Sequence, residues 1–510
     1  MSTGIGFGLT DVMGGSSGAI IGAYLMFFYT TFAGLTAVQA ASIFAVSKII
    51  DSVTGVVMGN ITDSFYRTKL GRKFGRRRFF LLIGAPLMLC YGLIWVNGFN
   101  YWYYFCTFIL FDILASVVLI PFETLPSEMT SDFNKRTLMS TCRMTCSGLA
   151  SAVCTIIGGW LISIMGDKNP KAYLFLGVTF SIIYVICVLV TYFSTWEREL
   201  TPEMINELNK EKSSKHLSFG EICVKLVDII KNYFSTLRVK AFRQHLIMYL
   251  FGVTAMDTIG TIFVYFIVFD MGSSASVASN LLSISLVGVP LGILWGLLFV
   301  KIGPANLLKF AYITVLVSIV GYYSIYIVHP KNGSLMLALI IASAVFQIGK
   351  SLVYFTPWNV FPFIPDVDEI ITGKRREGLF AAVMTFLRKS TSGISSIIVG
   401  LFLDKAGLVK GATTQTVVVQ NAIAYILLFG AGGLTVVALI FAFRFKLNTK
   451  THSVLINEIK RLKNNGSKED VNTETKKVVE SLTGVRYEKL WPIANNSSGV
   501  DDNILNQEAR

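Results

Sequence analysis

Charged side chains inside long apolar segments are the best candidates in this sequence for binding an ion or a polar solute. Asp51 stands between Ile50 and Ser52, well inside an apolar stretch that begins near residue 36. A carboxylate in hydrocarbon costs several kcal/mol unless it is paired or hydrated, so it marks a cation or solute path by default. The alternative is a structural pair with Lys48, three residues earlier on the same helical face.

Further charges lie in three other apolar stretches. Asp112, Ser116, Leu119 and Glu123 recur every three or four residues, which places them on one face of a helix. Arg143 and Lys389 can donate hydrogen bonds to hydroxyls or carboxylates inside a polar cavity. Arg388 lies about 100° around its helix from Lys389, so it is expected to snorkel or to pack elsewhere.

Two groups of opposite charge follow apolar segments near the ends of expected helices. We interpret them as contacts that hold the cytoplasmic face closed, and the alternative is that their basic residues only fix orientation. The residues expected in these groups are Asp63, Arg76, Arg77, Asp366, Asp368 and Arg375.

The composition requires a membrane environment for the elements that carry these residues. Of 510 residues, 53% are hydrophobic and 15% are charged. Apolar blocks long enough to cross a bilayer follow one another from about residue 11 to 446. The sequence therefore predicts an all-α polytopic protein rather than several soluble domains.

Twelve transmembrane helices are expected in two six-helix halves, which is the major facilitator arrangement. The halves echo each other at Ile120-Pro121-Phe122 and Phe361-Pro362-Phe363, each followed by acidic and then basic residues. The predicted units are 1–195 (first half), 196–242 (linker), 243–446 (second half) and 447–510 (tail). Linker and tail are expected to form solvated helices on the cytoplasmic face. The expected spans are 8–32, 36–62, 79–97, 101–126, 138–165, 172–195, 243–270, 276–300, 305–328, 334–364, 378–405 and 417–446.

The net charge of +14 comes largely from basic residues in alternate loops, such as Gly71 to Arg78. By the positive-inside rule both termini are cytoplasmic, and a nucleic-acid partner is not expected. The seven cysteines lack metal-ligand spacing, and the four histidines form no catalytic pattern. We therefore expect no enzyme and no bound cofactor or metal, beyond a transported Na⁺ or H⁺.

Several motifs together resemble the glycoside-pentoside-hexuronide cation symporters, the melibiose-permease-like branch of the major facilitator superfamily. The resemblance covers about residues 6 to 405. Its parts are Tyr24 to Thr30, Asp51, Met58-Gly59, Gly71 to Arg78, Ile120-Pro121-Phe122 with Glu128 and Thr130, Arg143, Lys389, and Ile364-Pro365-Asp366-Val367-Asp368-Glu369 with Gly373 to Gly378.

The resemblance implies Na⁺- or H⁺-coupled symport of a sugar, glycoside or sugar acid by alternating access. Arg143 and Lys389 match the family's solute-contacting cations. The aromatic side chains of Tyr24, Tyr354 and Trp358 could stack on a sugar ring, or could serve packing and anchoring. Asp257, Tyr265, Gln347 and Lys350 are polar residues of the second half without a family match, and we rank them lower.

The sequence departs from the family pattern at the cation site. Gly55 and Leu119 replace two expected aspartates, and Glu123 replaces an aromatic residue. We infer that the second carboxylate has moved to Asp112, so that Asp51 and Asp112 share the cation with help from Ser116 and Thr54. The alternative is that Asp112 lies in a wet cavity or pairs with a cation, and that coupling is to protons or absent.

The function expected from these observations is cation-coupled transport of a small polar solute by a monomer in the plasma membrane. An uncoupled facilitator or a transporter of a non-sugar solute would use the same spans. A membrane sensor with a signalling tail, a different class, would not need the charges at Asp51, Asp112, Arg143 and Lys389.

Overall fold

The computed structural model describes residues 2–130, 133–166, 168–197, 234–330, 333–373, 376–464 and 466–491. The first half contains six spans, of which the first is made of four helical segments and the third of two. In chain order its helices are α1 (Ser2–Gly8), α2 (Thr10–Ile20), η1 (Ile21–Leu25), α3 (Met26–Thr31), α4 (Ala37–Ser64), η2 (Phe65–Arg67), α5 (Lys69–Phe74), α6 (Arg78–Leu87), η3 (Met88–Trp95), α7 (Tyr101–Met129), α8 (Phe133–Met165) and α9 (Pro170–Ser194).

The second half repeats this plan. Eleven helices of the described chain are long and apolar enough to cross a membrane, and the continuous helical segments from Ala275 to Ile302 supply the remaining span. The twelve-helix prediction is therefore confirmed. The helices are α12 (Lys240–Tyr265), η4 (Phe266–Asp270), α13 (Ala275–Ser283), η5 (Ile284–Val287), α14 (Gly288–Ile302), α15 (Pro304–Val328), α16 (Gly333–Val360), η6 (Phe361–Phe363), α17 (Ile364–Thr372), α18 (Glu377–Lys405), α19 (Val417–Tyr425), η7 (Ile426–Ala431) and α20 (Gly432–Arg444).

Polar caps begin several spans where the apolar pattern starts. Thr36 caps α4 by accepting a hydrogen bond from the Gln39 amide, and the Gln39 side chain accepts one from the Thr36 amide in return. Asn100 caps α7 in the same way through the amide of Tyr103. These side chains satisfy amides that a helix start leaves unpaired, which explains why the spans begin at these residues.

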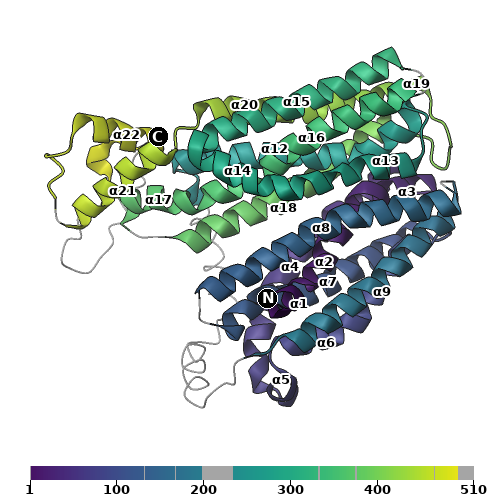
Figure 1. Cartoon of the computed structure of the whole chain (residues 1–510), viewed down its shortest axis with the longest axis horizontal. Coiled ribbons are helices and arrows are strands. Elements are labelled where there is room, and N and C mark those ends of the chain that lie inside the picture. The colour runs from purple at the N-terminus through teal and green to yellow at the C-terminus, as the bar shows by residue number, and fades with distance from the viewer. Residues whose placement is uncertain are drawn as a thin grey trace.

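The two halves meet at one end and diverge at the other. Figure 1 shows them close together near α3 and α13, and apart near α5 and α17. The contact follows α4 and α18, which run antiparallel. A Cβ built on Gly400 would lie 2.7 Å from the Ala37 carbonyl oxygen and 2.8 Å from the Ala41 Cβ. Glycine at position 400 therefore lets the two helices approach closely.

Hydrogen bonds close the end at which the halves meet. Asp404, at the end of α18, accepts bonds from the amides of Ala37 (2.8 Å) and Val38 (2.9 Å), and so caps α4 of the other half. The hydroxyls of Thr30 and Tyr265 lie 2.6 Å apart and join the first span to the seventh. These contacts fix the conformation in which the halves are closed at this end and splayed at the other.

The tail forms helices α21 (Thr449–Lys463) and α22 (Thr473–Thr483), followed by η8 (Tyr487–Lys489). They are not simply solvated, as the sequence had suggested, because Leu455, Ile459 and Leu462 are buried. Figure 1 shows α21 and α22 beside α17, at the end where the halves diverge. Most of the predicted linker, residues 198–233, lies outside the described residues.

Candidate functional site

An ion pair between the halves lies at the centre of the candidate site. Lys389 Nζ on α18 is 2.6 Å from Asp51 Oδ2 on α4, and the side chains are 31% and 17% exposed. Ser116 on α7 donates a hydrogen bond of 2.7 Å to the other oxygen, Asp51 Oδ1. Asp51 lies 14 residues after Ala37, which places it about 21 Å along α4, beyond the middle of a hydrocarbon core about 30 Å thick.

Asp112 lies beside this pair. Its Oδ2 accepts a hydrogen bond of 2.6 Å from Ser47 on α4, and it is close enough for the charges of Lys48, Asp51 and Lys389 to act on it. Asp51 and Asp112 thus share one polar region, each with its own serine. In the described part of the chain Lys48 forms no ion pair with Asp51, and Thr54 forms no hydrogen bond with either carboxylate.

Arg143 belongs to a separate cluster in the first half. Its Nε lies 3.2 Å from Asp11 Oδ2, and its Nη2 lies 3.2 Å from Glu123 Oε1. Asp11 is a member of this cluster that sequence reasoning missed. The signal was present, because Asp11 is a carboxylate in the apolar block of the first span. One guanidinium facing two carboxylates leaves the cluster with an excess negative charge.

Arg388 does not snorkel; it packs elsewhere than Lys389, within its own half, which is the second of the two predicted alternatives. Its two terminal nitrogens bind both oxygens of Asp257 on α12, at 2.7 and 2.9 Å. The angle of about 100° between adjacent helical residues explains why Arg388 turns to its own half while Lys389 turns to the other. Asp257, which we ranked low, is thus the partner of an intramembrane arginine.

The three candidate aromatic residues occupy different surroundings. Tyr24 is fully buried and packs edge-to-face on Tyr173, with ring centroids 6.1 Å apart. Tyr354 and Trp358 on α16 are 38% and 47% exposed. Trp358 lies edge-to-face with Tyr249, at 6.0 Å. Of the three, only Tyr354 and Trp358 have exposed ring surface in this conformation.

The predicted gate residues form contacts within their own halves. Arg76 lies 2.5 Å and Arg77 3.1 Å from Glu128, and Glu197 accepts hydrogen bonds from the backbone amides of Arg76 and Arg77. These groups tie the α5–α6 turn to α7 and to the end of α9. Of the other predicted members, Arg375 and the side chain of Asp63 lie outside the described residues.

The second predicted gate group binds the tail. Asp366 accepts a hydrogen bond of 2.8 Å from His452 Nε2, if that nitrogen carries the proton, and Glu369 lies 2.5 Å from Lys463. Asp368 binds two nitrogens of Arg376, at 2.8 and 2.6 Å. In this conformation these carboxylates hold α21 and the start of α18 against α17.

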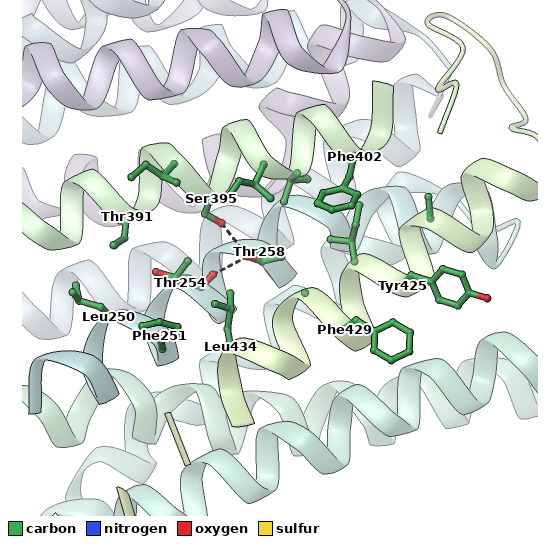
Figure 2. Close-up of a pocket in the computed structure, with 16 residues that line it drawn as sticks. Leu250, Phe251, Thr254, Thr258, Thr391, Ser395, Phe402, Tyr425, Phe429 and Leu434 are labelled. Carbon is green, nitrogen blue, oxygen red and sulfur yellow. Dashed lines mark hydrogen bonds between the residues drawn. The ribbon is translucent and has the colours of Figure 1, made fainter. Parts of the chain in front are cut away.

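A separate cavity of about 680 Å³ lies on another face of α18, between α12 and the last span, which consists of α19, η7 and α20. Figure 2 shows its lining, in which Thr258 is hydrogen-bonded to Ser395 and the rings of Phe402, Tyr425 and Phe429 stand along one side. These rings are largely exposed, as expected for side chains that face lipid. Because none of the described residues that line this cavity is charged, it does not suit a polar solute.

Comparisons with known proteins agree with this arrangement. The family described as MFS/sugar transport protein matches residues 6–449. An uncharacterized symporter of Synechocystis sp. is 25% identical, over 82% of this chain and 88% of its own. A glucuronide carrier protein homolog of Escherichia coli is 24% identical, over 89% and 94%.

Solved structures show the same fold. The inward open xylose transporter XylE from E. coli superposes with a TM-score of 0.59 at 14% identity, over 88% of this chain and 97% of that one. Three observations agree: the fold has two six-helix bundles, charged residues lie between them inside the membrane, and the family match covers most of the sequence. The chain belongs to the MFS/sugar transport family and is a transporter of this fold, not an enzyme.

Proposed function

We propose that this protein couples the movement of Na⁺ or H⁺ to symport of a sugar, glycoside or sugar acid by alternating access. The observation that carries the proposal is the Asp51–Lys389 ion pair, because it joins the two halves at a carboxylate deep in the membrane. The names of the relatives, a symporter and a glucuronide carrier homolog, support the same class of cargo.

Asp51 is suited to exchange one cation for another. Its Oδ2 is bound by the Lys389 ammonium, while Oδ1 is bound by the neutral Ser116 hydroxyl. A proton or Na⁺ that takes the place of Lys389 releases the only salt bridge between halves found in the described residues. Coupling follows if the cation binds the two conformations differently, since equal affinity for both would shift nothing.

Asp112 supplies the second carboxylate near this exchange. When Lys389 leaves, the charges of Asp51 and Asp112 repel each other, and a bound cation relieves that repulsion. Ser116 and Ser47 hold the two carboxylates in place, and each hydroxyl can turn to offer its oxygen to a metal ion.

The orientation proposed from the basic loops places α5 and the tail in the cytoplasm. The splayed end of the halves then opens to the cytoplasm, and the end sealed by Asp404 and Thr30 faces outside. The solute would bind between Arg143 in the first half and Tyr354 and Trp358 in the second, all partly exposed. We propose the plasma membrane as its location and a monomer as its working form, since each chain contains both halves.

A solute panel in proteoliposomes tests the proposal. Purified protein would be reconstituted, and uptake of labelled sugars, glycosides and sugar acids measured under an imposed Na⁺ gradient, an imposed proton gradient, and neither. Accumulation above equilibrium under one gradient supports symport. Equilibration without accumulation under either gradient would instead identify an uncoupled facilitator.

A further inference from the structure

Lys350 on α16 adds a positive charge to a pair that is already neutral. The bidentate contact with Arg388 uses both oxygens of Asp257. Lys350 is near enough to Asp257 for their charges to interact, yet no carboxylate in the described part of the chain lies within 4 Å of its ammonium. Its contact at this end is the ring of Phe346, with the ammonium 5.9 Å from the ring centroid. The group Asp257, Arg388 and Lys350 therefore carries an excess positive charge.

This group lies on the same helix as two aromatic residues with exposed ring surface. Lys350, Tyr354 and Trp358 are four residues apart and share one face of α16. Tyr354 also lies close to Arg388, and both Tyr354 and Trp358 are substantially exposed. Charged side chains within a span face water or protein rather than hydrocarbon. By this rule Lys350 faces water or protein, and we take the stripe that it shares with Tyr354 and Trp358 to belong to the polar surface of the second half.

The first half has the opposite balance. Arg143 faces two carboxylates, Asp11 and Glu123, so that cluster disfavours an anion and favours hydroxyl groups, which both donate and accept. A solute that bridges the two surfaces would therefore place hydroxyls at Arg143 and negative charge at Lys350. A neutral sugar would leave the charge of Lys350 uncompensated.

We propose that Lys350, with Arg388 and Tyr354 beside it, forms a subsite for the anionic group of the solute, and that this subsite makes the transporter selective for sugar acids over the matching neutral sugars. The inference rests on the proposed function, since it assigns the charged end of the same solute. Lys350 is a specificity-determining residue in this account, and Asp257 limits the affinity by competing for Arg388.

A matched pair of probes isolates the carboxylate. 4-Nitrophenyl β-D-glucuronide and 4-nitrophenyl β-D-glucoside differ only at C6, where one has a carboxylate and the other a hydroxymethyl group. Binding of each would be measured to full-length protein in nanodiscs made of zwitterionic phosphatidylcholine alone, so that no anionic lipid headgroup occupies the subsite. Gradient-driven uptake of the glucuronide by proteoliposomes would be measured separately.

We expect the glucuronide to bind more tightly, by about 10- to 100-fold for one charge-assisted contact. Lys350→Gln should remove most of this difference by weakening glucuronide binding, and Lys350→Arg should restore it. The matched control is Lys301→Gln at the exposed end of α14, which should have no effect.

The outcomes separate this inference from the proposed function. Equal binding of the two probes, or an equal loss of both in Lys350→Gln, would overturn the subsite while leaving sugar symport intact. A glucuronide preference that depends on Lys350, without gradient-driven uptake, would support the subsite and contradict symport. Binding of neither probe would overturn the subsite, and uptake of the wider solute panel would still decide on symport.

Discussion

Asp51 and Lys389 join the two halves of this transporter through an ion pair of 2.6 Å, on helices that run antiparallel and pack closely from this pair to the sealed end. Removing Lys389 leaves Asp51 with the Ser116 hydroxyl as its remaining hydrogen-bond donor in the described chain. Lys389→Met should therefore destabilise this conformation by about 1.5–3 kcal/mol, as loss of a charged hydrogen bond does. The double variant Asp51→Asn/Lys389→Met should recover part of the loss. A double-mutant cycle on thermal unfolding would measure the free energy of interaction between the two side chains. Additive effects of the two substitutions would show that the pair is not coupled.

Replacing each aspartate by asparagine, which has nearly the same volume, separates the role of Asp112 from that of Asp51. If the two carboxylates share the cation, Asp112→Asn should weaken gradient-driven accumulation much more than downhill equilibration, because it removes the repulsion that the cation relieves. Uptake with and without the gradient measures both quantities. Normal accumulation by Asp112→Asn, together with its loss in Asp51→Asn, would show that Asp51 acts alone, as a proton carrier.

Arg388 and Asp257 should be mutually dependent. Arg388→Ala leaves Asp257 charged and unpaired inside the membrane, which costs about 3–5 kcal/mol when a buried pair is broken. We expect a strong fall in folded protein, comparable for Asp257→Ala. The double variant Arg388→Met/Asp257→Leu should restore folding, as measured by size-exclusion profile and melting temperature. Single variants as stable as the wild type would contradict the pairing.

The sealed end should open when the approach of α4 and α18 is blocked. In Gly400→Val the new side chain meets the Ala37 carbonyl and the Ala41 methyl, whereas Gly433→Val is the control because a Cβ there has no heavy atom within 4 Å. A cysteine placed at Thr30, which is 2% exposed, in a background without native cysteines would report opening. We expect faster labelling by an impermeant maleimide from outside in Gly400→Val alone. Equal rates in both variants would show that this contact does not seal the transporter.

The packing of the tail should depend on pH in two ranges. Burial raises the pKa of Glu458, but hydrogen bonds from Arg461 and Tyr487 outweigh burial and leave that pKa below its usual value. Ionised Glu458 therefore stabilises the tail above its unfolded pKa, and the contribution is lost as pH falls below about 4. Burial and the neighbouring Glu458 raise the pKa of Tyr487 to about 12. Protonated Tyr487 stabilises the tail up to about pH 10, and this is lost as pH rises towards 12.

Hydrogen exchange in α21 and α22 across pH measures this docking. Glu458→Gln should abolish the acid-range change, and Glu474→Gln, at an exposed position in α22, should retain it. An acid-range change that is the same in Glu458→Gln and in the wild type would show that another group is responsible.

Apolar length was enough to predict the spans, because hydrocarbon thickness fixes how many residues a helix needs. The predicted fourth and eleventh spans, 101–126 and 378–405, differ from α7 and α18 by only a few residues at either end. Charge within a span likewise singled out Asp51, Arg143 and Lys389 as candidates, and the structure places each of them in an ion pair. The sequence could not predict which charged residues pair. Lys389 and Asp51 are 338 positions apart, and other charged residues lie nearer to each of them in the sequence.

Arg388 shows that helical direction alone does not identify a partner. The angle of about 100° between Arg388 and Lys389 predicts that the two side chains point in different directions. Only the placement of α12 shows that Arg388 faces a carboxylate, Asp257. The tail was misread for a similar reason. The amphipathic pattern of α21 indicates an apolar face, but the pattern alone does not show whether that face packs on lipid or on protein. The structure places α21 beside α17, with its apolar residues buried.

The most direct test of the account is accumulation of the preferred solute by wild type and Asp51→Asn in proteoliposomes with an imposed Na⁺ or proton gradient. The wild type should accumulate solute above equilibrium under one of the two gradients. The Asp51→Asn variant should let the solute equilibrate at a measurable rate but should not accumulate it. The neutral amide cannot balance the charge of Lys389 or of the transported cation. Accumulation by Asp51→Asn to the wild-type level would contradict the claim that this carboxylate couples the cation to the solute.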